Sequence, residues 1–243
     1  MEVAKGIHRE TLGVVNWYLV EEGDKLTIVD AGTPKDWSRL AQAVAALGRR
    51  LEDVDAVLLT HAHSDHTGFA ERARREIGAT VFVHQGDAER AKGAKPPKNE
   101  AGIGRYLLRV EAYRTLFGLL LRGGVKLIPI AEVSTFGDGE TIDVPGRPRA
   151  LHLPGHTAGM AALLFEDRSA ACTGDALVTH NPLTGRNGPQ IAPSGLNLDS
   201  GLALASLSSL EGIEADVLLP GHGDPWTEGA AEAVRRARAA GRS

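Results

Sequence analysis

Short apolar runs separated by turn residues recur along the chain and predict a series of strands. The run at 55–59, DAVLL, is continuously apolar, as is typical of a strand buried on both faces. The runs at 13–20 and 25–30 are rich in β-branched and aromatic residues and flank the turn Glu22-Gly23-Asp24. Strands are therefore expected at 13–20, 25–30, 55–59, 80–84, around Ile128, and at 140–144, 150–153, 161–165, 170–173 and 216–219.

Helical signals lie between these runs. Pro34 begins a predicted helix that ends before Gly48, and Gly78 is expected to cap a second helix at its carboxyl end. From Ile103 onward apolar residues recur at helical spacing until Gly123-Gly124. Helices are therefore expected at 34–47, 67–77, from 103 to the paired glycines, and at 199–210 and 228–240. Residues 90–98, which contain Pro96-Pro97, are expected to form a loop.

Composition limits the class of protein. The 243 residues carry a formal charge of −4, which gives no global cationic field, so a nucleic-acid partner is not expected. The single cysteine excludes an intrachain disulfide and a multi-cysteine zinc site. No secretory signal and no run of membrane-spanning length is evident, so a cytoplasmic protein with no membrane association is expected. No low-complexity linker divides the chain, and one domain over 1–243 is predicted.

Histidine is concentrated in one short segment, His61-Ala62-His63-Ser64-Asp65-His66, directly after the apolar run at 55–59. Three imidazoles and a carboxylate at this spacing would repel one another when protonated and would be hard to satisfy when buried. A bound cation removes both problems, so the segment predicts metal binding. His61 and His63 can point one way while Asp65 and His66 point elsewhere, which suits two adjacent metals better than one tetrahedral site.

Three more potential ligands follow predicted strands, each directly after a glycine. They stand in Leu153-Pro154-Gly155-His156, Thr173-Gly174-Asp175 and Leu219-Pro220-Gly221-His222. Glycine lets the backbone turn sharply and leaves room beside a metal. His156, Asp175 and His222 are therefore the expected additional ligands.

This set of motifs, together with Asp30-Ala31-Gly32, resembles the metallo-β-lactamase superfamily over nearly the whole chain apart from residues 90–126. The resemblance implies an α/β fold, a four-layer αββα sandwich with a helical insertion around 90–126. It implies that one metal is held by His61, His63 and His156, a second by Asp65, His66 and His222, and that Asp175 bridges them. It also places Asp30 behind the metal loop as a supporting residue.

The ligand set indicates a hydrolase in which two divalent ions share a water. Metal-bound water ionises near neutral pH, and the resulting hydroxide would attack an ester, thioester or lactone, with Asp65 and Asp175 as the catalytic carboxylates. Ligands without thiolate favour zinc and leave iron or manganese open. The alternatives are a phosphodiesterase, an iron-dependent sulfur dioxygenase and an inactive binding protein. In the superfamily, true zinc β-lactamases carry Cys or Ser where this chain has Asp175, so β-lactam hydrolysis is not expected as the main activity.

Several other residues receive structural interpretations. Cys172 is expected to be a small buried residue, and His84 and His152 to be structural. His8 is expected to be solvated. His180 is either a loop histidine or part of the substrate pocket.

The segment 90–126 carries nine basic and two acidic residues. One interpretation is that Arg105 and Arg109 form the solvated face of an amphipathic helix. A second is that this helix is a lid whose cations attract an anionic small-molecule substrate. A third is that its apolar residues, such as Phe117, form the contact of a homodimer.

Overall fold

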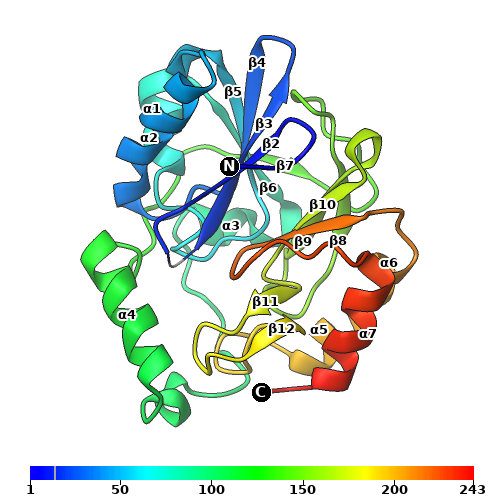
Figure 1. The fold of residues 1–243 in the computed structure, drawn as a ribbon. Coiled ribbons are helices and arrows are strands. Elements are labelled where there is room, and N and C mark those ends of the chain that lie inside the picture. Colours follow the sequence, from blue (N-terminus) through cyan, green and yellow to red (C-terminus); the bar gives the residue numbers. More distant parts are fainter. Residues whose placement is uncertain (14) are drawn as a thin grey trace.

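The computed structural model describes residues 1–13 and 15–243 and contains two β-sheets packed face to face (Figure 1). The first sheet has seven strands in chain order, antiparallel from β1 to β4 and parallel from β4 to β7. Its strands are β1 (Glu2–Ala4), β2 (Ile7–Thr11), β3 (Asn16–Glu22), β4 (Lys25–Val29), β5 (Val54–Leu59), β6 (Thr80–His84) and β7 (Ser134–Phe136). Val14, part of the expected first strand, lies outside the described residues.

The second sheet has the order β13-β10-β9-β8, in which only the β10–β13 pair is parallel. Its strands are β8 (Arg149–His152), β9 (Ala161–Phe165), β10 (Ala170–Gly174) and β13 (Val217–Pro220). A separate hairpin is formed by β11 (Val178–His180) and β12 (Asn187–Gln190).

Most of the helices cover the outer faces of the two sheets, and one stands apart at the edge of the molecule (Figure 1). They are α1 (Trp37–Ala46), α2 (Ala70–Ile77), α3 (Ala88–Ala91), α4 (Val110–Arg122), α5 (Ser200–Ser206), α6 (Ser208–Glu211) and α7 (Ala230–Ala240). Five short 3-10 turns complete the described elements: η1 (Pro34–Asp36), η2 (Leu51–Asp53), η3 (Gln85–Asp87), η4 (Ile103–Tyr106) and η5 (Glu166–Arg168).

Alternation along β3 explains the layering. Trp17 and Leu19 pack with the apolar residues of α1 and α2, whereas Tyr18 and Val20 pack with the inner face of the second sheet. Successive side chains of a strand point to opposite faces, so a strand that is apolar on both faces must be covered on both. The outer face of the second sheet packs against α5, α6 and α7 in the same way. The expected four-layer αββα arrangement is therefore confirmed.

Several expected elements were wrong. Within the described range 123–133 no strand forms around Ile128, and residues 140–144 make only one bridge, from Thr141 to Arg149. The helix expected from Ile103 is divided into η4 and α4, because Arg109 adopts an extended conformation at the start of α4. The strands β1, β2, β7, β11 and β12 were missed, since their sequences lack an apolar run.

Helix α4 stands apart from both sheets at the edge of the molecule (Figure 1). Its outer face exposes Tyr113, Phe117 and Leu120, the last two at 61% and 64%. None of the described helices is long and apolar enough to cross a membrane. The homodimer suggested by this apolar face stays a prediction.

Candidate metal centre

The seven predicted ligands converge at one edge of the two sheets. The segment from His61 to His66 follows β5, while His156, Asp175 and His222 follow β8, β10 and β13. Each residue therefore lies beyond the carboxyl end of its strand. Five of the seven are buried, and the two exceptions are His63, which is partly buried, and Asp65, whose side chain is 16% exposed.

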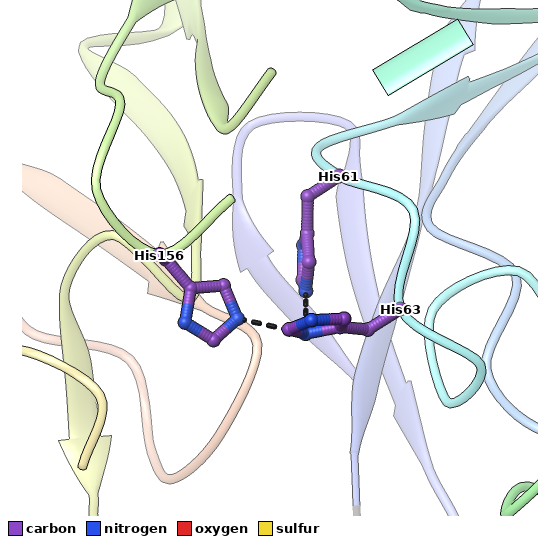
Figure 2. Close-up of side chains that lie close together, drawn as sticks. All are labelled: His61, His63 and His156. Atoms are coloured by element: carbon purple, nitrogen blue, oxygen red, sulfur yellow. Dashed lines mark hydrogen bonds between the residues drawn. The ribbon is translucent and has the colours of Figure 1, made fainter. Parts of the chain in front are cut away.

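Three imidazoles form the first half of the cluster, as Figure 2 shows. The Nε2 atom of His61 lies 3.2 Å from Nδ1 of His63, and Nε2 of His156 lies 2.9 Å from the same Nδ1. Nitrogen atoms from two different sheets thus meet within hydrogen-bond distance. Such convergence of lone-pair atoms is typical of a cation site.

The second half combines Asp65 with two further imidazoles. Oδ2 of Asp65 lies 3.9 Å from Nε2 of His66 and 3.6 Å from Nε2 of His222. The ligand atoms of these three residues lie within 4.8 Å of one another.

Asp175 lies between the two halves. Its Oδ1 is 3.6 Å from Nε2 of His66, and its Oδ2 is 3.5 Å from Nε2 of His156 and 3.3 Å from Nε2 of His222. One carboxylate oxygen therefore faces the second half while the other is shared by both, which is the placement expected of a bridging group.

Hydrogen bonds behind the cluster aim the imidazoles. Nδ1 of His66 donates to Oδ2 of Asp30 at 2.8 Å, because a carboxylate can only accept. Thr60 donates to the same carboxylate through its backbone N–H and its hydroxyl, and this hydroxyl accepts from Nδ1 of His61. Because Nδ1 of each ring is held in this way, both rings turn Nε2 towards the centre. Asp30 thus lies where the resemblance placed it.

The charges of the cluster balance one another. Burial lowers the pKa of His61 and His63, and neighbouring imidazoles act in the same direction. Burial also acts to lower the pKa of His66, but Asp30, Asp175 and Asp65 outweigh it and raise this pKa to about 10. Burial favours a higher pKa for Asp175, yet His222 and His66 hold that pKa well below its usual range.

Two buried atoms without hydrogen-bond partners indicate whether the residues are suited to hold a metal ion. Among the described residues, Nε2 of His66 and Oδ1 of Asp175 are both buried, both unpartnered, and face each other. Buried polar atoms in native proteins are nearly always satisfied. A cation between them would satisfy both, and a donor set of imidazole and carboxylate suits zinc and similar ions. The residues therefore fit a metal site.

Sequence reasoning missed two residues that support the site. Asp87, in η3, accepts the backbone N–H of Ala62 and that of Gly159, both at 2.8 Å, and so links the loops that carry His63 and His156. Its position three residues after a predicted strand end offered a weak signal.

Asn197 is the second missed residue. Its amide nitrogen donates to Ala192 O, so its Oδ1 faces His156 and accepts from Nδ1 at 2.8 Å. No feature of the local sequence distinguishes Asn197 from an ordinary loop residue.

A cavity of ≈ 680 Å³ opens onto the centre and is lined by His63, Asp65, Asp175 and His222. The cations among its lining residues are Arg90 and Lys98. Arg105 and Arg109 are exposed and do not line it, in agreement with the solvated-face interpretation of that pair.

The remaining singled-out residues lie away from this cavity. His180 is not among its lining residues; its Nδ1 bonds to Asn187 and its Nε2 lies 3.4 Å from Glu111 of α4. Cys172 is buried in the core, as expected. The rings of His84 and His152 stack at 4.1 Å. His8, expected to be solvated, is instead partly buried and pairs with Glu21 at 2.6 Å.

Comparisons with known proteins agree with this geometry. "Probable metallo-hydrolase YflN" of Bacillus subtilis is 25% identical over 240 residues, which cover 93% of this chain and 87% of that protein. A hydroxyacylglutathione hydrolase of Acidiphilium cryptum is 31% identical over 161 residues, 66% of this chain. This alignment spans only 48% of that relative's length.

A solved structure has the same fold. The metallo-β-lactamase family protein TTHA1429 from Thermus thermophilus superposes with a TM-score of 0.69 at 24% identity, covering 97% of this chain and 79% of that one. The family model of the metallo-β-lactamase superfamily matches residues 11–222. With the fold, the clustered histidines and aspartates and this match in agreement, the chain belongs to the metallo-β-lactamase superfamily.

Proposed function

We propose that the chain is a dinuclear metal hydrolase that cleaves an ester, thioester or lactone, with Zn²⁺ as the metal. The observation that carries the proposal is the position of Asp175, whose carboxylate lies 3.5 Å from His156 of one ligand set and 3.6 and 3.3 Å from His66 and His222 of the other. A single ion would not need a carboxylate placed between two complete sets of ligands.

In this proposal His61, His63 and His156 would hold one ion, Asp65, His66 and His222 would hold the other, and Asp175 would be shared between them. When bound, such ions lower the pKa of water towards about 7 and polarise the substrate oxygen.

The protein's own groups supply orientation and proton handling. Asp65 is the less buried of the two carboxylates and lines the cavity, so it is placed to orient water and to accept a proton. Asp30, through His66 and Thr60, holds Nδ1 of His66 and His61 so that their Nε2 atoms face inward. Asn197 does the same for His156.

Elemental analysis of the purified protein tests the metal content. We expect about two transition-metal ions per chain, and loss of the first ion from a variant that combines His61→Ala with His156→Ala. Full metal content in the folded double variant would contradict the ligand assignment.

A substrate panel tests the reaction. It should contain chromogenic esters, thioesters, lactones and bis(p-nitrophenyl) phosphate, each assayed before and after treatment with a chelator. Chelator-sensitive turnover of a carboxylic ester, thioester or lactone is the expected result. Turnover of the phosphate diester alone would favour the phosphodiesterase, and iron with thiol-dependent oxygen uptake would favour the sulfur dioxygenase.

A further inference from the structure

The inner face of α4 forms an apolar wall of the cavity that opens onto the metal centre. Thr115, Leu116 and Leu119 line the cavity from this helix, while Phe117 and Leu120 point away and are exposed. Thr115 donates its hydroxyl to Pro182 O at 2.7 Å, which fixes the rotation of the helix. The wall facing the cavity is therefore defined by the fold.

Other lining residues of the cavity, outside α4, are also apolar. Ile103, Leu183 and Leu196 line it, and the last two belong with Tyr106 to a small buried cluster. Clefts of about 300–1,000 Å³ with mostly apolar walls and a few polar groups are typical of small-molecule sites. Binding of an apolar ligand against such walls is favourable because it removes apolar surface from water.

The lining segments outside α4 also support the metal centre. The backbone N–H of Glu100 donates to the carbonyl of Asn197, the residue that orients His156. Asn99 donates to Gly195 O at 2.7 Å. Hydrogen bonds thus connect these lining segments of the cavity to the metal centre.

Two basic side chains that line the cavity, Arg90 and Lys98, can pair with an anionic group of a ligand. Arg90 lines the same cavity as His63, and its guanidinium donates to Ala94 O at 3.2 Å. Within the described residues no carboxylate forms an ion pair with Arg90 or Lys98. Glu100 also lines the cavity, but it accepts from the Ser200 backbone and pairs with Arg242 at 3.1 Å.

Resting on the proposed hydrolase function, we propose that the substrate is an amphiphilic acyl ester or thioester. Its apolar acyl chain packs against Leu116, Leu119, Leu183 and Leu196, and an anionic group close to the cleaved bond pairs with Arg90. In the reaction, the oxygen of water forms a bond to the acyl carbon and the bond to the alcohol or thiol breaks. A fatty acid is released, and the alcohol or thiol leaves with a proton.

A chain-length series tests the apolar wall. Acetyl and decanoyl thioesters of 3-mercaptopropionate differ only in the acyl chain, and we expect kcat/KM to be about tenfold or more higher for decanoyl. The larger side chain in Leu119→Trp fills the space beside this wall and should reduce the decanoyl-to-acetyl ratio of kcat/KM about tenfold. Leu120→Trp, one residue away on the exposed face, is the matched control and should leave the ratio unchanged. Leu116→Gln gives a second test if Leu119→Trp fails to fold.

Two thioesters that differ in charge test the proposed role of Arg90. The decanoyl thioester of 3-mercaptopropionate is compared with the neutral decanoyl thioester of 2-mercaptoethanol. Arg90→Gln should lower kcat/KM about tenfold for the anionic thioester relative to the neutral one, because a neutral amide cannot pair with its carboxylate. Arg105→Gln, an exposed arginine of the same segment, should leave this ratio unchanged.

Binding without turnover separates this inference from the proposed function. Calorimetric titration with decanoate should show binding to the unmodified protein and to Leu120→Trp, and loss of binding in Leu119→Trp. If no thioester is hydrolysed but decanoate binds in this pattern, the hydrolase proposal fails and the acyl site stands. Equal kcat/KM for acetyl and decanoyl, with no binding of decanoate, would overturn the acyl site.

Discussion

Asp30 offers the sharpest single test of how the protein controls its metal ligands. Its backbone has a φ of 60°, and Asn tolerates this left-handed conformation about as well as Asp does. Asp30→Asn therefore keeps both shape and backbone. The retained amide oxygen can still accept the Thr60 N–H, which lies 2.8 Å from Oδ1. Only the group at Oδ2 changes, from an acceptor to a donor.

The consequence falls on His66. Its Nδ1 lies 2.8 Å from Oδ2, so an amide NH₂ in that place would face an N–H. To avoid this, the ring must move its proton to Nε2, the atom that lies 3.6 Å from Asp175 Oδ1 and is needed as a ligand. Loss of such a supporting partner typically lowers metal affinity about 10- to 100-fold. That corresponds to about 1.4 to 2.8 kcal/mol of binding free energy.

Competition with a chromogenic chelator measures this affinity directly. Asp36→Asn is the matched control, because Asp36 is equally buried and accepts from Thr33 and Trp17 but touches none of the proposed ligands. Both variants should lose stability to urea, and only Asp30→Asn should lose metal affinity. Affinity within about twofold of the unmodified protein in folded Asp30→Asn would refute the reasoning.

Three further changes probe the proposed bridging group, the close approach beside it and a partly buried ion pair. Asp175→Asn should reduce hydrolysis by orders of magnitude while circular dichroism stays native, since the bridging charge is lost; near-normal turnover would argue against the bridge. Gly221→Ala places a methyl on the Asp175 carboxylate and should cost about 1–3 kcal/mol in urea unfolding, whereas Gly212→Ala, in open space, should be close to neutral. The hydrogen bond from Arg74 lowers the pKa of Glu71, so its stabilisation is present above the unfolded-state pKa of about 4.3 and disappears as pH falls through the folded-state pKa. Glu71→Gln should therefore cost about 0.5–1 kcal/mol at pH 7 and less at pH 4, and an equal cost at both would contradict this assignment.

Much of the centre could be predicted from the sequence because its chemistry is local. His61, His63, Asp65 and His66 lie within six residues at the end of one apolar strand, so their proximity follows from the spacing alone. Strands with an apolar run, such as β5 and β9, were also predicted, because burial on both faces requires such a run.

Other parts depended on packing between distant segments. The short strands β1, β2, β11 and β12 have no apolar run of their own, and their pairing is decided by the neighbouring strand. The strand expected around Ile128 failed for the opposite reason: an apolar residue there lacks a partner strand among the described residues. Local sequence patterns do not determine which strand a segment will pair with.

The sequence by itself determined which chemical groups are present and that each follows a strand. Only the tertiary structure decided that His156, Asp175 and His222, from the second sheet, meet the histidines of the first. This meeting depends on the two sheets packing through Tyr18, Val20 and their partners, so that the carboxyl ends of β5, β8, β10 and β13 reach one edge. The tautomer of His156, set by Asn197 forty-one residues away, likewise exists only once the chain is folded.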